Sequence, residues 1–441
     1  MRQAIDLYKN YGMYTNTKKM IPSIIDGLLP VHRRMLLVLH NIASTTKVKT
    51  VTANGELVGK YHPHAESVGP AVWAVRNEFA IGYGQWGSYI GIEAIKPAAA
   101  RYTSIKANPI IEKMVMKYVK YVQWDLNELD FEEPKYLPTQ FPLCLIGKEY
   151  LSSIGFGIKA DIPIYEVKDL YKRLLFLLGK TDKEPIISPY IPNCEILSTK
   201  KDIKKLLTDG EVTLQIKGKY IEDKKNNRIY VLGWEPRTKF KTIYKSIARY
   251  KSYDLFDSES VGILDESNAN NGSYIRFEVL KQRNVKETYD KMKEAIDNAL
   301  TSNIRFAMYV VDETGKNFKL TNVDEMLLTC FEHYKNTYKK YCTDSVINIK
   351  NTVTEYDIIN RLKPHISTVT ANTKQTIDDS IKKLSKLTGD SEDDIKHIIG
   401  KYNIRKLLSI NFDKTDLINE LKEFKTKLNN LEEYVLKEYD I

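Results

Sequence analysis

An α+β multidomain fold is predicted from three differences along the 441 residues. Residues 1–120 alternate short helical patterns with glycine-rich turns, and residues 121–320 contain strand-like runs separated by turns. From about residue 323 onward, long charged helical patterns dominate. A chain of this length has room for two to four domains. Its 42% hydrophobic and 28% charged residues are typical of folded globular proteins.

Several classes of protein are excluded by the composition. No apolar run approaches the roughly 18 residues that a membrane span needs, and the N-terminus has no signal-peptide core. Cys144, Cys194, Cys330 and Cys342 are far apart and form no CxxC pair. This spacing argues against a zinc ribbon and a disulfide scaffold. We therefore expect no membrane partner and a reducing, cytoplasmic location.

The positive charge is concentrated near the N-terminus. Residues 1–120 contain 16 Lys and Arg but only 7 Asp and Glu, and the net charge of the whole chain is +10. Concentrated positive charge favours a polyanionic partner, because binding to phosphates releases counterions. A solvated basic face is at least as common an explanation. The presence of His32, His62 and His64 in the same segment favours the polyanion.

Helices and a wing are expected in this first section. Pro30 begins an amphipathic helix, and a second helix is expected after residues 62–64, with its start bent or delayed by Pro70. The alternating glycine and aromatic residues at 82–91 predict a β-hairpin or wing. Together these elements have the outline of a winged helix-turn-helix, which can place one helix in a groove of DNA.

The middle section is predicted to be a mixed α/β scaffold with little net charge. Strands are predicted at 212–222, 226–234, 272–280 and 304–312.

The last section carries two seams of apolar residues. The first consists of Leu327, Phe331, Tyr334, Tyr338 and Tyr341. The second consists of Leu417, Leu421, Phe424, Leu428, Leu431 and Val435. Alternating spacings of four and three residues are typical of an a/d heptad seam, so the two helices could form an antiparallel coiled coil with a small helical cap. Two amphipathic helices packed on an ordinary core explain the spacing equally well.

Two motifs that suggest a ligand are rejected on their spacing. Residues 177–181 end like a phosphate-binding P-loop, but Leu174 stands where the motif needs a glycine. We expect a helix C-cap and a turn there. His62-Pro63-His64 has no cysteine nearby, which argues against zinc. We also find no acidic cluster for catalytic magnesium.

A candidate nucleophile lies within residues 97–105. A tyrosine hydroxyl is a poor nucleophile unless neighbouring cations stabilise its anion. Arg101 directly precedes Tyr102, and a guanidinium can pair bidentately with a phosphate. An Arg-Tyr pair alone means little in a chain with 29 tyrosines, but the small residues before it allow close approach of DNA.

Ordered blocks of sequence carry a family resemblance. The first four blocks are DGLLPVHRRML (26–36), GKYHPHAES (59–67), GYGQWGS (82–88) and AAARYT (98–103). They resemble, in order and approximate spacing, the breakage-reunion subunit of type IIA DNA topoisomerases, the family of the gyrase A subunit, the topoisomerase IV C subunit and the phage topoisomerase medium subunit. Later blocks that resemble this family are YLPTQFPLCLIG (136–147), SSIGFGIKADIP (152–163), ILDESNANNGSYIRFEV (263–279) and NIRKLLSINFDKTDLINELKEF (403–424).

The resemblance implies a catalytic and DNA-binding site. Tyr102 aligns with the nucleophile that attacks the scissile phosphate and stays linked to the DNA 5′ end, and Arg101 aligns with the neighbour that steadies the phosphate. Ile154 matches the isoleucine that is wedged between base pairs to bend the DNA. Lys19 stands where the family usually has an arginine, and Ser67 matches the serine of the quinolone-contact helix. Together with these two, the other implied DNA-binding residues are His32, Arg33, Arg34, Lys60, His62 and His64.

The resemblance also implies domains and partners. The domains are a winged-helix (CAP-like) DNA-cleavage domain at 1–125, a tower domain at 126–322, coiled-coil arms at 323–350 and 411–441, and a helical C-gate dimerisation domain at 351–410. Nothing in the chain resembles the ATPase or the TOPRIM domain. A gyrase B-like partner subunit is therefore expected to bind Mg²⁺ and ATP, and the chain is expected to act on double-stranded DNA as a homodimer within a heterotetramer or larger complex.

Departures from the family bear on drug sensitivity and loop geometry rather than on the expected chemistry. Ala65 and Leu29 replace a Gly and a Lys of the family, and the loop from Ser88 to Arg101 is longer than in gyrase. No β-pinwheel domain for DNA wrapping follows the second seam, so relaxation or decatenation is expected rather than supercoiling. The composition, rich in Lys, Asn and Ile, suggests a phage or another AT-rich genome. The alternative function is a non-catalytic, dimeric DNA-binding protein on the same scaffold.

Overall fold

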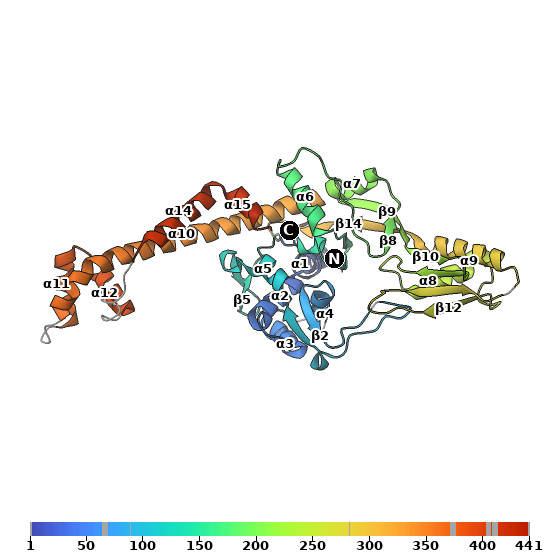
Figure 1. The fold of residues 1–441 in the computed structure, drawn as a ribbon, viewed down its shortest axis with the longest axis horizontal. Coiled ribbons are helices and arrows are strands. Elements are labelled where there is room, and N and C mark those ends of the chain that lie inside the picture. The colour runs from blue at the N-terminus through green and yellow to red at the C-terminus, as the bar shows by residue number, and fades with distance from the viewer. Residues whose placement is uncertain are drawn as a thin grey trace. The chain divides into compact units, whose positions relative to one another are not determined.

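The computed structural model contains two compact units, residues 1–334 and 335–440. It describes residues 2–63, 69–88, 90–281, 283–370, 376–402, 407 and 413–439. The first unit combines helices with small antiparallel sheets, and the described residues of the second are mainly helical, which confirms the predicted α+β class (Figure 1). None of the described helices combines the length and the hydropathy that a membrane span requires.

The first part of unit one is helical with a three-stranded sheet in the order β1-β3-β2. Its elements are α1 (Arg2–Thr15), η1 (Asn16–Met20), α2 (Pro30–Ala43), β1 (Val48–Lys49), α3 (Thr50–Lys60), α4 (Gly69–Arg76), β2 (Ala80–Tyr83), η2 (Ala100–Tyr102), β3 (Ser104–Ala107), α5 (Pro109–Met116) and η3 (Val119–Tyr121). The start of α2 at Pro30 confirms the prediction, since the first turn of a helix does not need the missing N–H. Met35 and Leu39 of α2 pack with Leu57 of α3 and Ile105 of β3 in a shared core.

A tight hairpin within residues 82–91 is not formed, and the role of this stretch as a wing stays a prediction. β2 instead pairs with β3, so most of the glycine-aromatic stretch lies in the long connection between these strands. A Cβ atom on Gly82 would lie 2.5 Å from Nε1 of Trp86, which shows that the Trp86 ring folds back onto the strand that precedes it. Gly84 and Gly87 have φ angles of +98° and +79°, and these left-handed conformations end the extended backbone.

A five-stranded antiparallel sheet follows, in the order β6-β7-β14-β9-β8. The elements of this region are β4 (Trp124–Leu126), β5 (Glu132–Pro134), η4 (Leu143–Leu145), β6 (Leu151–Gly155), β7 (Ile158–Ile162), α6 (Val167–Leu177), β8 (Cys194–Ile196), α7 (Lys200–Thr208), β9 (Glu211–Gly218) and β14 (Thr301–Ala307). β9 and β14 account for the first parts of the strands predicted at 212–222 and 304–312, but these strands end earlier, at Gly218 and Ala307. Helix α6 ends before Gly179, whose φ of +68° confirms the predicted C-cap and turn.

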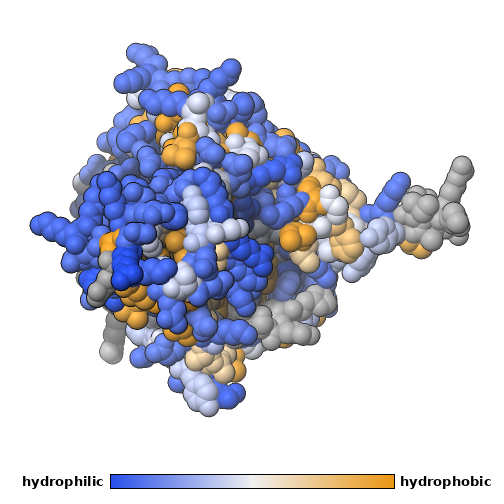
Figure 2. Space-filling model, turned by 90° about the vertical axis from the view of Figure 1, so that its right-hand side faces the viewer, coloured by the Kyte–Doolittle hydropathy of each residue, from blue (hydrophilic) through white to orange (hydrophobic). Residues whose placement is uncertain are grey.

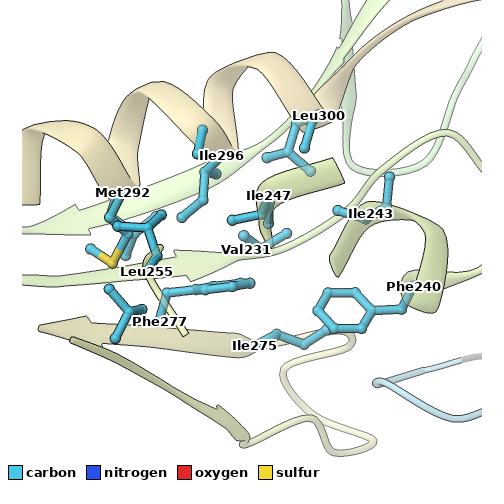
Figure 3. Close-up of a cluster of buried hydrophobic side chains, with 14 of the residues drawn as sticks. Val231, Phe240, Ile243, Ile247, Leu255, Ile275, Phe277, Met292, Ile296 and Leu300 are labelled. Atoms are coloured by element: carbon cyan, nitrogen blue, oxygen red, sulfur yellow. The ribbon is translucent and has the colours of Figure 1, made fainter. Parts of the chain in front are cut away.

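A four-stranded antiparallel sheet, in the order β10-β11-β13-β12, forms a separate layer under two helices. Its elements are β10 (Tyr220–Asp223), β11 (Arg228–Val231), α8 (Phe240–Arg249), η5 (Tyr250–Ser252), β12 (Val261–Asp265), β13 (Ile275–Val279) and α9 (Val285–Leu300). Figure 3 shows Met292 and Ile296 of α9 directed toward Val231 and Phe277 of the sheet. β11 and β13 confirm two predicted strands, whereas β12 was not predicted.

The second unit is built on the distal part of α10. The first unit ends with β15 (Tyr309–Val311), β16 (Phe318–Leu320) and the start of α10 (Val323–Thr370). The second unit contains the rest of α10, followed by α11 (Ile377–Thr388), α12 (Glu392–Lys401), α14 (Thr415–Asn429) and α15 (Leu431–Lys437). Leu362 and Ile366 of α10 share a buried core with Ile381 of α11 and Ile395 of α12.

Helices α14 and α15 run back along α10 (Figure 1). The ring centroids of Tyr341 and Phe424 are 5.7 Å apart, so residues of the two seams are in contact. The second seam is divided between two helices, because Asn430 leaves the helical conformation with φ −118° and ψ 43°. Phe424 and Val435 are its buried positions. Whether the two helices form a regular coiled coil stays a prediction.

The face seen in Figure 2 is mainly hydrophilic, with hydrophobic side chains in small separate groups. Among the large hydrophobic residues that are most exposed are Tyr102 (66%), Ile110 (69%) and Ile154 (70%), which lie on three different elements. Isolated exposed hydrophobic residues are normal on a protein surface, so exposure alone does not mark a site.

Candidate functional site

Tyr102 lies at the end of the η2 turn, with its side chain exposed to solvent. The backbone N–H of Tyr102 donates to the carbonyl oxygen of Ala99 at 2.9 Å and closes the turn. The guanidinium carbon of Arg101 lies 4.7 Å from the centroid of the Tyr102 ring. This distance is within the range of a cation–π contact, so the Arg101 guanidinium lies beside the Tyr102 ring.

The backbone that follows Tyr102 is fixed to the start of α3. Thr103 is buried, and its hydroxyl donates to the hydroxyl oxygen of Thr50 at 2.8 Å. The backbone N–H of Thr50 donates in turn to the carbonyl oxygen of Thr103 at 3.1 Å. The backbone next to the exposed Tyr102 side chain is therefore held in place by two hydrogen bonds to Thr50.

Arg33 is held by a buried carboxylate. Its Nε and Nη2 atoms donate to the two oxygens of Asp26 at 2.6 and 2.9 Å, and Asp26 is completely buried. Asp26 also accepts the backbone N–H groups of Leu28 and Leu137 at 3.1 and 3.0 Å. The Asp26 carboxylate thus joins the loop before α2 to a segment more than one hundred residues later.

Arg34 joins two residues that the sequence leaves far apart. Its Nε and Nη2 atoms donate to Glu133 at 2.7 and 2.8 Å, and its Nη1 atom lies 2.9 Å from Nδ1 of His62. A guanidinium can only donate, so Nδ1 of His62 is the acceptor and the neutral ring carries its hydrogen on Nε2. Arg34 therefore fixes both the tautomer and the orientation of His62.

Arg33, Arg34, His62 and Glu133 line a cavity of about 650 Å³. The structure brings Lys19, Arg33, Arg34 and His62 together in its wall, whereas Tyr102 lies outside it. The other charged residues of the lining are Lys18, Lys135, Lys316, Asp125 and Glu128. A concave surface with an excess of cations is suited to phosphate groups.

His32 is packed flat against Trp73. The two ring centroids are 3.7 Å apart with an angle of 7° between the ring planes. Burial lowers the pKa of His32 to about 3, so the ring is neutral near pH 7 and cannot act there as a cation for a phosphate. Its implied role at the DNA stays a prediction, and the packing restricts that role to stacking or neutral hydrogen bonding.

This environment of His32 predicts a loss of stability in mild acid. The unfolded chain takes up a proton at His32 below about pH 6.5, whereas the folded chain does so only near pH 3, so stability falls as the pH falls between these values. At pH 5 we expect this residue to reduce the free energy of unfolding by about 2 kcal/mol. In urea unfolding, His32→Phe should lose less stability between pH 7 and pH 5 than the wild type, and equal losses would contradict a neutral ring packed against Trp73.

The remaining implied DNA-binding residues lie on other elements or outside the described residues. Lys60 ends α3 and pairs with Glu56 at 2.5 Å. Ile154 projects from β6 with 70% of its surface exposed. His64 and Ser67 lie outside the described residues.

The described residues offer no site for a resident metal ion. No group of three or more His, Cys, Asp or Glu side chains among them is arranged to hold one. We therefore assign no chemical step to a metal held by the described part of this chain.

Comparison with known proteins identifies the family. The family model for the A subunit of DNA gyrase/topoisomerase IV matches residues 19–441, which is nearly the entire chain. The chain belongs to the DNA gyrase/topoisomerase IV A-subunit family. Tyr102, Arg101 and the cavity residues from Lys19 onward all lie within the matched range.

Several members of this family are similar in sequence. The DNA gyrase A subunit of Helicobacter pylori is 26% identical over 357 residues, which cover 74% of this chain and 41% of that protein. The DNA gyrase A subunit of Thermotoga maritima is 27% identical, covering 75% and 42%. The DNA topoisomerase 4 A subunit of Neisseria gonorrhoeae is 27% identical, covering 50% and 30%. The chain thus spans about two fifths of the length of the gyrase relatives that it matches.

Proposed function

We propose that the chain is the DNA-cleaving and rejoining subunit of an ATP-dependent type IIA DNA topoisomerase. The observation that carries this proposal is Tyr102, exposed beside the guanidinium of Arg101 on a turn anchored to α3. A solvent-facing tyrosine with a cation on its ring and a rigid backbone fits a nucleophile that attacks a phosphate brought by DNA. Membership of the gyrase and topoisomerase IV family supports the assignment.

The proposed reaction is a reversible transesterification. The Tyr102 hydroxyl gives up its proton, and its oxygen attacks the scissile phosphorus. The bond between phosphorus and the 3′ oxygen breaks, and the 3′ oxygen takes up a proton and leaves as a hydroxyl. The phosphotyrosyl ester on the 5′ end conserves the phosphodiester energy, so the reverse reaction reseals the strand without ATP. Arg101 would pair with the non-bridging phosphate oxygens.

The DNA is proposed to lie on the first part of unit one. Helices α2 to α4 and the β1-β3-β2 sheet would act as a winged-helix domain, with the basic cavity contacting phosphates. Ile154 would insert between base pairs and bend the duplex, as apolar wedges on other DNA-bending proteins do. The two larger sheets would form the tower that supports the bent DNA.

Two copies of the chain are needed for a double-strand break, because each copy supplies one Tyr102. The helical core of α10, α11 and α12 is the proposed C-gate contact that holds the two copies together while the DNA is open. A second duplex would pass through this gate. Relaxation or decatenation, rather than supercoiling, is the proposed outcome.

A partner subunit with ATPase and TOPRIM domains is proposed to bind Mg²⁺ and ATP. With that subunit, magnesium and ATP, the chain should relax a supercoiled plasmid. Alone, it should bind the plasmid without cutting it or hydrolysing ATP. Plasmid binding without relaxation in the complete mixture would favour the non-catalytic alternative, and magnesium-dependent cutting by the chain alone would contradict a metal site on the partner.

Replacing Arg101 with Lys should reduce the rate of cleavage at least tenfold with little change in DNA affinity. The positive charge is kept, but the planar fork that can grip two phosphate oxygens is lost. Single-turnover cleavage by the complete complex measures the effect. A rate equal to that of the wild type would limit Arg101 to a role in shaping the turn.

A further inference from the structure

The β6–β7 hairpin, which carries Ile154, is tied to the N-terminal helices by one buried amide. Asn16, in η1, is only 2% exposed. The backbone N–H of Phe156 donates to Oδ1 of Asn16 at 2.7 Å, and Nδ2 of Asn16 donates to the carbonyl oxygen of Phe156 at 3.1 Å. Both polar groups of one backbone residue at the hairpin turn are therefore paired with one side chain.

The hairpin is shaped to receive this side chain. A Cβ atom on Gly155 would lie 2.3 Å from Oδ1 of Asn16, so only a glycine allows the amide to approach so closely. The hydroxyl of Ser153 donates to the carbonyl oxygen of Met20 at the end of η1. Residues 153 and 155 thus face η1.

Ile154 faces the opposite way, because side chains alternate along a strand. The 70% exposed side chain of Ile154 lies between two residues that are both in contact with η1. The next residue after Gly155, Phe156, is 40% exposed, and its ring contacts those of Tyr8 and Tyr11 of α1, with centroids 6.0 and 5.7 Å away and the ring planes steeply inclined. One face of the hairpin is anchored, and the other presents the apolar wedge.

We propose that Asn16 is a positioning residue for the DNA wedge, which holds the hairpin so that Ile154 can enter the base stack. This inference rests on the proposed function, because it takes Ile154 as the residue that bends DNA. Insertion between base pairs costs several kcal/mol of stacking and kinks the duplex. The hairpin that carries the inserted side chain must therefore keep its position while the DNA is bent. An amide that pairs with both backbone groups of the turn supports the hairpin in this way without touching the DNA.

The test measures bending and binding separately. A short duplex labelled at its ends with a fluorescent donor and acceptor is mixed with the full chain, without magnesium so that no strand is cut. The wild type should bend the duplex and increase energy transfer between the labels, and Asn16→Ala should produce only a small part of that increase. The Kd for the duplex should change by less than about threefold, because many phosphate contacts remain. Gly155→Ala should reduce bending in the same way, because its Cβ atom would displace the Asn16 amide from the hairpin turn.

Matched variants separate positioning from folding. Asn108 also accepts one backbone N–H, from Ile110 at 3.1 Å, and donates to one backbone carbonyl, of Glu78 at 2.7 Å. Asn108→Ala removes an equivalent pair of hydrogen bonds from a more exposed side chain, so it should lower the melting temperature and leave DNA bending unchanged. The double variant Asn16→Ala with Gly155→Ala should bend DNA at least as much as Gly155→Ala alone, because removing the Asn16 amide also removes its clash with the new Cβ atom at position 155.

Each outcome has a distinct reading. Normal bending by a folded Asn16→Ala variant, or equal loss of bending in Asn108→Ala at equal stability, would overturn the role of Asn16. Normal bending by Ile154→Ala would instead overturn the wedge in the proposed function. Loss of bending in Ile154→Ala and Asn16→Ala, but not in Asn108→Ala, is the result that the proposal predicts.

Discussion

Replacing Tyr102 with Phe is expected to abolish DNA cleavage while changing DNA affinity by less than about twofold. The substitution removes only the hydroxyl oxygen that is proposed to attack phosphorus, and it keeps the ring on which the Arg101 guanidinium lies. One hydroxyl adds little to binding that depends on many phosphate contacts. Cleavage is measured with the partner subunit in the presence of magnesium, and affinity is measured on the same duplex without magnesium.

Tyr83→Phe is the matched control for this prediction. Tyr83 is 40% exposed on β2, and Nζ of Lys47 lies 4.9 Å from the centroid of its ring. It therefore combines exposure with a neighbouring cation, and its loss should leave cleavage intact. Strand breakage by Tyr102→Phe at the wild-type rate would refute the assignment of the nucleophile.

The largest loss of stability is expected from Asp26→Ala. Removing this carboxylate leaves the guanidinium of Arg33 without its partner in a site where Arg33 is 12% exposed, and it also deprives the N–H groups of Leu28 and Leu137 of their acceptor. Breaking a buried ion pair by removing one partner costs about 3–5 kcal/mol. Urea unfolding at pH 7 should show a loss of this size in the free energy of unfolding.

The control for Asp26 is an exposed acid in the same unit. Asp209 follows α7 and accepts a hydrogen bond from the Thr208 hydroxyl at 2.8 Å. Asp209→Ala should change stability by less than about 0.5 kcal/mol, as surface substitutions do. Similar small losses in both variants would show that Arg33 finds other partners or water, and that the Asp26 contact is not a fixed support for the cavity.

Local patterns predicted much of the fold. Pro30 marked the start of α2 because proline suits a first helical turn. Strand-like runs separated by turn residues predicted β11 and β13, and each strand has one face on a core. The tight hairpin at 82–91 was predicted wrongly because glycines and aromatic residues are compatible with both a hairpin and a bent loop, and the fold of Trp86 onto Gly82 depends on tertiary packing.

The candidate site was predicted in its residue types but not in its contacts. Arg34 was named as a DNA-binding residue, whereas its partner Glu133, 99 residues away, was missed because nothing local marks the pairing. Asp26 stood in one of the family-like blocks without a role, and its burial becomes visible only in the structure. Asn16 gave no signal at all, because a polar residue near a helix end is usually interpreted as a capping or solvated group.

The central claim is that Tyr102 becomes covalently joined to DNA, and one measurement tests it directly. The chain is incubated with its ATPase/TOPRIM partner, magnesium and a duplex labelled at the 5′ ends, the reaction is stopped with detergent, and the protein is digested and analysed by mass spectrometry. The account predicts one peptide, containing Tyr102, that carries a nucleotide through its tyrosine oxygen at a DNA 5′ end. A nucleotide on any other residue, or a link to a 3′ end, would contradict it.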